Sequence, residues 1–252
     1  MKLYILLPAY NEEKDLEKLV GSLGGYLRTL GTEYKIVVVD DGSHDRTAQI
    51  AENLIQRYPL KLIQHSVNKG YGAAIQTGFS FILSDGQDPD VLVTMDCDNT
   101  HPTECLAHLL KQIDRGCHLA IASRYQEGGG QVGFSLKRRL LSRGASWLLR
   151  FLFPINGVRD YTSGYRAYRL SALQQAMRRY NNRLIESNGF TAPMEILLKV
   201  RLLGFKIEEV PLILRYDLKN GVSKMKTMKT ILAYIKVLWL YQHSKERIEK
   251  KN

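Results

Sequence analysis

The chain has 252 residues, 44% hydrophobic and 24% charged, which is enough for one sizeable core. Its formal net charge of +11 favours polyanionic partners: nucleic acid, anionic lipid or phosphorylated substrates. The three cysteines show no CxxC spacing and the N-terminus has no signal-peptide pattern, so we expect a reduced, cytosolic environment. No apolar run reaches the roughly 20 residues of a transmembrane helix, which predicts a protein that is soluble or peripheral on a membrane.

The first half of the chain alternates predicted strands with predicted helices. Asn11 is expected to cap the first helix, which begins with two acids favoured near a helix N-terminus. The strands are nearly continuously apolar, which predicts an α/β fold with a mostly parallel sheet covered by helices on both faces. We expect strands at 3–7, 34–39, 60–64, 91–95 and 118–122, and helices at 12–30, 45–57, from 72 to about 83, and after Pro102.

The second half opens with three glycines at 128–130, a flexible break. Residues 128–159 contain no acid, and leucines and aromatics interleave with six bases: Lys137, Arg138, Arg139, Arg143, Arg150 and Arg159. This pattern predicts one or two basic amphipathic helices that lie on an anionic membrane. The alternative is core helices with a solvated basic face.

Two further elements are expected near the C-terminus. A strand at 207–214 contains Pro211, so it should be an edge strand or an irregular one. A lysine-rich helix from 224 to about 251 again combines basic, apolar and aromatic side chains, which favours a second amphipathic surface.

Polar side chains follow five of the predicted strands. In parallel sheets, ligands bind beyond the carboxyl ends of the strands, so we expect a ligand site there. The alternative is that these are ordinary polar loops. The residues concerned are 8–12, Asp40 and Asp41, Asn68 and Lys69, 96–98, and Ser123 and Arg124.

Asp96 and Asp98 stand at the end of the apolar run 91–95. Side chains at i and i+2 of an extended segment point the same way, and two adjacent carboxylates repel unless a cation lies between them. A hard divalent cation fits this pair and can bridge to a diphosphate. The alternative is a polar loop in which one Asp caps the next helix.

Several longer motifs occur in order along almost the whole chain: 8–13, 39–47, 68–74, 95–98 with His101 and Pro102, 122–125 with Gly128 and Gly129, 162–168, 209–211 and 221–224. Together they resemble the inverting family 2 glycosyltransferases, and within them the dolichol-phosphate mannose synthase branch. The resemblance implies a GT-A fold, expected over residues 1–222 and followed by the basic helix at 223–252. It also implies a nucleotide-diphospho-sugar donor, a Mg²⁺ or Mn²⁺ ion, and a polyprenyl-phosphate acceptor reached on the cytoplasmic face of a membrane.

The resemblance also assigns roles to individual residues. The nucleotide-sugar site is expected to comprise Pro8, Tyr10, Glu12, Asp40, Asp41, Lys69, Asp96 and Asp98. Asp96 and Asp98 would hold the metal. The acceptor phosphate would meet Arg124, Arg138 and Ser142. Catalytic roles fall to Asp98, Arg124 and Asp160; Asp160 is a candidate base by analogy with neighbouring branches, or a structural cap.

Some features depart from the branch. Cys97 replaces its usual Ala, Thr100 replaces a longer amide or Ser, and Arg215 and Lys219 compete for the role of an Arg close to Gly221. The donor is expected to be GDP-mannose, with UDP-glucose or another UDP-sugar as the alternative. Many relatives carry C-terminal transmembrane helices; here membrane attachment would rely on the basic helices or on a membrane partner subunit.

Other functional classes fit less well. Ile75 stands where the last glycine of a dinucleotide-binding G-x-G-x-x-G is required, and no G-x-x-x-x-G-K-[ST], H-E-x-x-H or G-x-S-x-G occurs. Acid-rich strand ends would repel nucleic acid. A polysaccharide synthase would show Q-x-x-R-W and spanning helices. A non-catalytic sugar-nucleotide scaffold remains as the alternative, and metal-dependent release of GDP or UDP distinguishes it from an enzyme.

Overall fold

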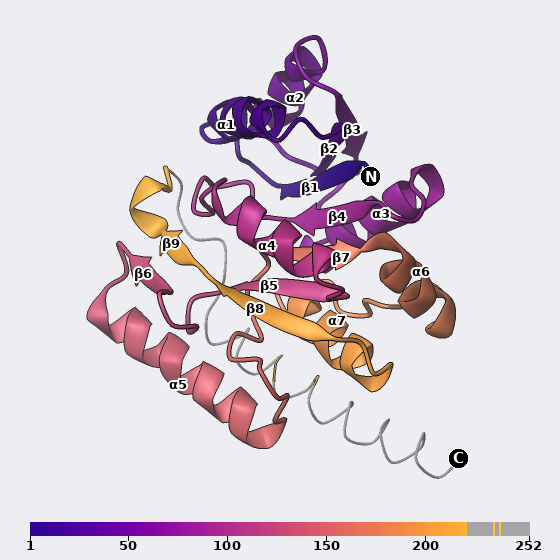
Figure 1. The fold of residues 1–252 in the computed structure, drawn as a ribbon. Coiled ribbons are helices and arrows are strands. Elements are labelled where there is room, and N and C mark those ends of the chain that lie inside the picture. The colour runs from indigo at the N-terminus through magenta and orange to yellow at the C-terminus, as the bar shows by residue number, and fades with distance from the viewer. Residues whose placement is uncertain (221–233, 235–236, 238–252) are drawn as a thin grey trace.

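The structure, a computed structural model, describes residues 1–220, Tyr234 and Val237, but not the side chains of Lys137, Arg138 and Leu141 (Figure 1). The predicted helix at 224–251 therefore lies outside the described residues, apart from Tyr234 and Val237, and so does the motif at 221–224. The strands are β1 (Leu3–Ala9), β2 (Tyr34–Asp40), β3 (Leu60–Gln64), β4 (Val91–Thr94), β5 (Leu119–Ser123), β6 (Gly130–Val132), β7 (Arg166–Arg169), β8 (Ile207–Pro211) and β9 (Ile213–Arg215). The helices are α1 (Leu16–Thr29), α2 (Thr47–Ile55), α3 (Tyr71–Asp85), α4 (Cys105–Asp114), α5 (Leu136–Leu152), α6 (Leu170–Arg179), α7 (Ala192–Leu202) and the short 3₁₀ turn η1 (Tyr216–Leu218).

Seven strands form the central sheet in the order β3-β2-β1-β4-β7-β5-β8. Neighbouring strands pair in parallel except β7, which runs antiparallel between β4 and β5. The prediction of a mostly parallel sheet is confirmed. β8 is an edge strand, as predicted, but it ends at Pro211 and not at residue 214. The rest of the predicted strand belongs to β9, which pairs with β6 in a separate two-stranded sheet that was not predicted.

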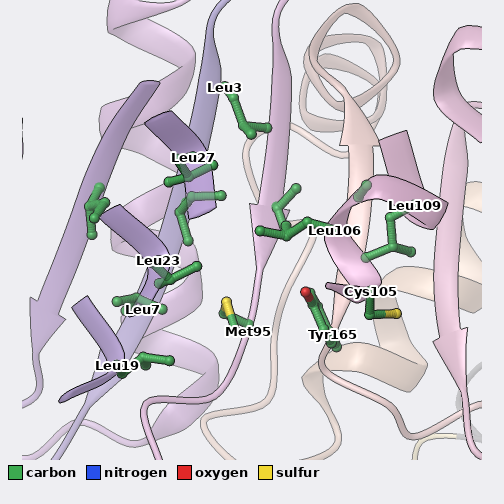
Figure 2. Packing of buried hydrophobic residues seen from close by; sticks show 14 of the residues in the cluster. Leu3, Leu7, Leu19, Leu23, Leu27, Met95, Cys105, Leu106, Leu109 and Tyr165 are labelled. Atoms are coloured by element: carbon green, nitrogen blue, oxygen red, sulfur yellow. The ribbon is translucent and has the colours of Figure 1, made fainter. Parts of the chain in front are cut away.

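Alternate residues of the strands divide the core into two layers, as the period of two requires. Leu3, Ile5 and Leu7 face α1, α2 and α4, whereas Tyr4 and Leu6 face α3, α6 and α7. Figure 2 shows the first layer, with side chains of β1 packed against those of α1. Helices therefore cover both faces of the sheet, as predicted, and leave the ends of its strands open to a ligand.

The N-terminus of α1 differs from the prediction. The helix begins at Leu16, and Asn11 does not cap it; Asn11 has a left-handed backbone with φ of 52°. The segment before the helix bonds instead to the loop after β2: Glu12 N–H donates to Thr47 Oγ1 at 2.7 Å, and His44 N–H donates to Asn11 Oδ1 at 2.9 Å. These long-range bonds tie the segment to the loop after β2, and the helix has Asp15 at its N-cap position, so the predicted cap was wrong.

The acid-free stretch forms a single 17-residue helix, α5, which runs along the edge of the molecule away from α1 and α2 (Figure 1). Leu149 is 3% exposed and joins the second core layer, but much of the helix is uncovered. Trp147 and Phe151 are 65% and 70% exposed and stack on each other with ring centroids 5.7 Å apart. Both predicted features are thus present on α5: a face that meets the core and an exposed face with apolar and basic side chains.

Candidate active site

A cavity of about 620 Å³ opens at the carboxyl ends of β1, β2, β4 and β5. Parallel strands bring their ends to one edge of a sheet, which is why segments far apart in the chain meet here. Eight of the predicted site residues line the cavity: Pro8, Tyr10, Glu12, Asp41, Asp96, Asp98, Arg124 and Ser142. Asp40, Lys69 and Asp160 do not line it, and the side chain of Arg138 is outside the described part of the structure.

The two aspartates after β2 have different surroundings. Asp40 is 3% exposed. Its carboxylate accepts hydrogen bonds from the backbone N–H of Ser43, at 3.1 Å, and from the hydroxyl of Ser43. It therefore stabilises the turn after β2. Asp41 is equally buried but lies at the cavity, where it accepts the backbone N–H groups of Lys69 and Gly70 at 2.9 and 2.7 Å. Asp41 thus fixes the path of the next loop, whereas the Lys69 side chain is exposed to solvent.

A histidine that sequence reasoning did not select supports Asp41. His65 Nδ1 lies 2.7 Å from Asp41 Oδ1, and its Nε2 lies 2.9 Å from Thr77 Oγ1. Because a carboxylate only accepts, His65 Nδ1 carries the proton that it donates to Asp41. Asp41 is therefore held from three directions before any ligand binds.

The loop that starts α3 packs tightly against the segment before α7. A Cβ at Gly70 would lie 2.1 Å from Asn188 O, and a Cβ at Gly72 would lie 2.0 Å from Ser187 O. Only glycine allows the two segments to approach so closely. The contact brings Phe190 against Tyr71, with stacked rings 5.2 Å apart, and both residues line the cavity. Nothing local in the sequence marks Phe190, because its place depends on this long-range contact.

Asp96 and Asp98 both face the cavity, as their spacing predicts. Asp96 is the more open, with 40% of its side chain exposed; its backbone N–H donates to His101 Nδ1 at 3.1 Å. Asp98 is more enclosed, and its Oδ1 accepts the hydroxyl of Thr100 at 2.6 Å. Its Oδ2 lies 2.5 Å from Lys219 Nζ. The pair is thus held at the end of β4 with one carboxylate open and the other already paired to a cation.

These surroundings shift the pKa values of the two carboxyl groups in opposite directions. Desolvation raises the pKa of Asp96, and the negative charge of Asp98 adds to this effect. Burial also opposes ionisation of Asp98, but the Lys219 ammonium outweighs it and lowers the pKa of that carboxyl below its ordinary value. Of the two carboxyl groups, Asp98 is therefore the one that ionises at the lower pH.

The donor set of this pair suits a hard divalent cation. Carboxylate oxygens are the ligands that Mg²⁺ and Mn²⁺ prefer. The ion pair between Lys219 and Asp98 shows that this position already attracts a cation. Among the described residues no group of three or more His, Cys, Asp or Glu converges on one point. Asp96 and Asp98 would thus supply only part of a coordination shell, and the remaining oxygens would come from a diphosphate and water.

Lys219 and Arg215, the two basic candidates before Gly221, have different partners. Arg215 turns to Asp217, with 2.8 Å between its guanidinium and the carboxylate, and that pair is exposed. Lys219 lines the cavity and reaches Asp98. Of the two, only Lys219 is positioned to meet a diphosphate bound at the pair.

At the end of β5, two strands along the sheet from β4, a buried ion pair supports the cavity wall. The Arg124 guanidinium donates to both carboxylate oxygens of Asp160 at 2.7 Å and to Thr162 Oγ1 at 2.6 Å. Asp160 is fully buried, and although burial raises the pKa of its carboxyl, Arg124 lowers it below the ordinary range. A carboxylate so fully engaged is a weak base. It holds the Arg124 side chain at the cavity wall.

Helix α5 completes this wall. Ser142, Ala145 and Ser146 line the cavity, and Ser142 Oγ lies 2.7 Å from the Tyr125 hydroxyl. The side of α5 that lines the cavity and the exposed Trp147 and Phe151 belong to one continuous helix. The acidic pair and this basic wall, predicted separately from the sequence, therefore belong to a single cavity.

Comparison with known proteins identifies the family. Residues 4–176 match the family model Glycosyl transferase family 2. The chain belongs to this family. The predicted glycosyltransferase assignment is confirmed.

Curated relatives of this family 2 enzyme cover most of the chain. It is 36% identical over 242 residues to a dolichol-phosphate mannosyltransferase of Pyrococcus furiosus, covering 95% of this chain and 63% of that protein. It is 35% identical to a polyprenol monophosphomannose synthase of Mycolicibacterium smegmatis, covering 92% of this chain and 84% of that protein. It is 34% identical to an undecaprenyl-phosphate mannosyltransferase of Micrococcus luteus, covering 89% of this chain and 88% of that protein. The chain thus spans less than two thirds of the first relative's length.

Solved structures agree on the fold. Glucosyl-3-phosphoglycerate synthase from Mycobacterium tuberculosis, in complex with Mn²⁺, UDP and glucosyl-3-phosphoglycerate, superposes with a TM-score of 0.71 at 19% identity, covering 95% of this chain and 79% of that one. The same synthase has also been solved with Mg²⁺ and UDP, and that structure gives a TM-score of 0.68. The expected GT-A fold is confirmed for this family 2 glycosyltransferase.

Proposed function

We propose that this enzyme transfers a mannosyl group from GDP-mannose to a polyprenyl phosphate, with inversion at the anomeric carbon. The observation that carries the proposal is a single cavity lined both by the carboxylate pair Asp96 and Asp98 and by Arg124 and α5. An acidic pair suits a cation-bound diphosphate, and an arginine suits a phosphate monoester. The three relatives named above, all mannosyl-transferring by name, support this pairing of substrates.

On the donor side, Asp96 and Asp98 would hold the divalent ion. When bound, Mg²⁺ or Mn²⁺ neutralises the charge that develops on the departing diphosphate. Asp41, held by His65 and the loop at 69–70, would help to bind the nucleotide together with Pro8, Tyr10 and Glu12. Asp40 would act indirectly, through the turn that it stabilises.

On the acceptor side, little general-base help is needed. The second pKa of a phosphate monoester is about 6, so near neutral pH the acceptor oxygen is already anionic. Arg124, Ser142 and Arg138 would hold that phosphate facing the anomeric carbon, opposite the leaving diphosphate. Asp160 would orient Arg124 through two hydrogen bonds of 2.7 Å rather than accept a proton.

A donor and acceptor panel tests the proposal. The protein is incubated with GDP-mannose, other GDP-sugars and UDP-sugars, each with a short polyprenyl phosphate and Mg²⁺ or Mn²⁺, and the lipid product is identified by mass spectrometry. We expect a mannosyl phosphate ester and release of GDP that stops when EDTA is added. A product from UDP-glucose alone would instead favour the UDP-sugar alternative, and nucleotide binding without any product would favour a scaffold.

We further propose that the enzyme works on the cytoplasmic face of a membrane, with α5 against the lipid. No helix in the described part of the chain is both long and apolar enough to span a bilayer. A polyprenyl tail does not leave the bilayer readily, since each buried CH₂ contributes about 0.8 kcal/mol. The exposed Trp147 and Phe151 lie on the same helix as the exposed bases Arg143 and Arg150, which suits an anionic surface.

Vesicle co-sedimentation tests this attachment. Binding should require anionic lipid and should fall as salt is raised, because each basic residue near such a surface contributes about 1 kcal/mol that salt screens. Equal recovery in the supernatant with anionic and neutral vesicles at low salt would contradict direct docking and would favour a membrane partner subunit.

A further inference from the structure

The side chain of Lys219 is more enclosed than is usual for a lysine. Its ammonium lies 2.5 Å from Asp98 Oδ2, and the side chains of Lys219 and Asp98 are only 10% and 11% exposed. Both line the cavity beside Asp96. The lysine thus neutralises the carboxylate at the point where, under the proposed function, a divalent ion would bind.

The backbone on either side of Lys219 is fixed to the same region. Arg215 N–H donates to Thr100 O at 2.9 Å, and Asn220 Nδ2 donates to Asp15 Oδ1 at 2.7 Å. Asp15 also receives Asn99 Nδ2 at 2.8 Å, so one buried carboxylate ties the loop after β4 to the segment that carries the lysine. The Lys219 Cα is therefore anchored close to Asp98, while its ammonium lies at the end of a flexible four-carbon stem.

A metal ion and this ammonium cannot both occupy Asp98 Oδ2. Two cations within contact distance repel strongly in a partly enclosed site, and the Lys219 stem can move its charge away while the anchored backbone stays. A bound diphosphate would bring new negative charge into the same cavity. The released ammonium then has a partner within the reach of its side chain.

We propose that Lys219 is an exchangeable counter-ion: it neutralises Asp98 in the free enzyme, yields Asp98 to the metal, and moves to the donor diphosphate. This inference rests on the proposed function, because it assumes metal and nucleotide at this cavity. It makes the binding of free metal unfavourable, since the ammonium must lose its partner. It makes the binding of metal together with a diphosphate favourable, because the ammonium gains a new partner. Lys219 thereby selects the metal–nucleotide complex over the metal alone.

This exchange predicts two effects of opposite sign from one substitution. In Lys219→Gln, Asp98 is left without a competing cation, so free Mn²⁺ should bind about tenfold more tightly, within the range of roughly 5–150-fold usual for coupled sites. GDP, at saturating Mn²⁺, should bind more weakly by about the same factor, because the diphosphate has lost a cation. The cooperativity between Mn²⁺ and GDP should fall accordingly.

Arg215→Gln is the matched control. It removes one positive charge four residues away on the same segment, but Arg215 pairs with Asp217 and does not line the cavity. Both affinities should stay within about twofold of the wild type, since exposed charges are well screened. Lys219→Arg is the second control: it keeps the charge, so its Mn²⁺ affinity should stay nearer to the wild type than that of Lys219→Gln.

The experiment measures free Mn²⁺ by electron paramagnetic resonance during titration of the full chain, with and without GDP, and GDP affinity by calorimetry. Thermal melting checks that each variant is folded. Unchanged or weaker Mn²⁺ binding by a folded Lys219→Gln would overturn the inference, as would equal effects of Arg215→Gln. A wild type that binds neither Mn²⁺ nor GDP would overturn the proposed function and this inference with it.

Discussion

The two sides of the cavity are built in different ways. The donor side, with Asp41, Asp96 and Asp98, consists of short acidic side chains at the ends of sheet strands, tied down by neighbouring loops. The acceptor side consists of one buried ion pair and a helix whose far end is open, with Phe151 70% exposed. A rigid side suits a small polar donor, whose atoms must be held within a fraction of an ångström. An exposed helix suits an acceptor whose lipid tail remains in the bilayer.

The charges of the two sides also differ in how they are balanced. On the donor side Asp98 is compensated by Lys219 and, under the proposed function, by metal. On the acceptor side Arg124 is compensated by Asp160, which is fully buried. Changes on the donor side should therefore affect chemistry with little effect on folding, whereas changes at the ion pair should affect folding as well.

Of the substitutions considered, Asp98→Asn should lower the activity of the enzyme most. The substitution keeps the shape of the side chain but removes the charge proposed to hold the metal, and loss of several kcal/mol of transition-state stabilisation lowers kcat about 10³-fold. Thermal melting should show an intact fold. Near-normal turnover at saturating Mn²⁺ would rule out the assignment of Asp98 as a metal ligand.

Asp160→Asn should affect the acceptor side through stability. It leaves the buried Arg124 guanidinium without a counter-charge, and removing one partner of such a pair costs about 3–5 kcal/mol in the free energy of unfolding, measured by urea denaturation. The control is Glu17→Gln, which breaks an exposed pair with Arg57 and should cost less than about 1 kcal/mol. A loss below that value for Asp160→Asn would contradict the structural importance of the pair.

The same pair predicts a pH dependence. The folded-state pKa of Asp160 is lowered below its ordinary value of about 3.9, so its stabilising contribution is fully present above that pH. It is lost as the pH falls through the folded-state pKa. The stability difference between the wild type and Asp160→Asn should thus persist at pH 5 to 7 and shrink only under more acidic conditions.

Arg138→Ala tests whether α5 contributes to acceptor binding. Loss of one charge-assisted hydrogen bond, worth roughly 1.5–3 kcal/mol, should raise the KM for a short, soluble polyprenyl phosphate about tenfold or more, with the KM for GDP-mannose unchanged. Arg143→Ala removes an exposed base from the same helix and should leave both constants unchanged. A change confined to GDP-mannose would show that the predicted role of Arg138 is wrong.

The smallest effect is expected at the exposed end of α5. Trp147→Ser and Phe151→Ser should each lower the partition onto anionic vesicles about fivefold, the equivalent of about 1 kcal/mol for partial insertion of a ring. The free energy of unfolding should hardly change, because both rings are exposed. Ile55→Ser, at the C-terminal end of α2, removes an apolar side chain that is 41% exposed elsewhere and serves as the control. Equal losses in all three variants would argue against α5 as the docking surface.

The donor side was largely predictable from the sequence, because apolar strands followed by polar residues carry a local pattern. β7 was not predicted, since Arg166 gives its sequence the character of a surface segment. In the structure Arg166 is completely buried and donates to the backbone carbonyls of Pro193 and Tyr161. A buried arginine that bonds to the carbonyl of Pro193, 27 residues further along the chain, leaves no local signal.

The same limit applies to individual site residues. The sequence could not separate Lys219 from Arg215, or the structural Asp40 from the cavity-facing Asp41, because each pair differs only in which neighbours its side chains meet. Phe190 was missed for the related reason that two glycines bring it to the cavity from outside the predicted motifs.

The reversed strand β7 has a consequence for the order in which the enzyme can assemble during synthesis. Strands β3, β2, β1 and β4 are adjacent in the sheet and all lie within the first 94 residues. β5 emerges next, but its place is beside β7, so it must wait until residues 166–169 have left the ribosome. N-terminal segments generally fold first during translation. The nascent chain can therefore form the half of the sheet that carries Asp41, Asp96 and Asp98 well before the half that carries Arg124 is complete.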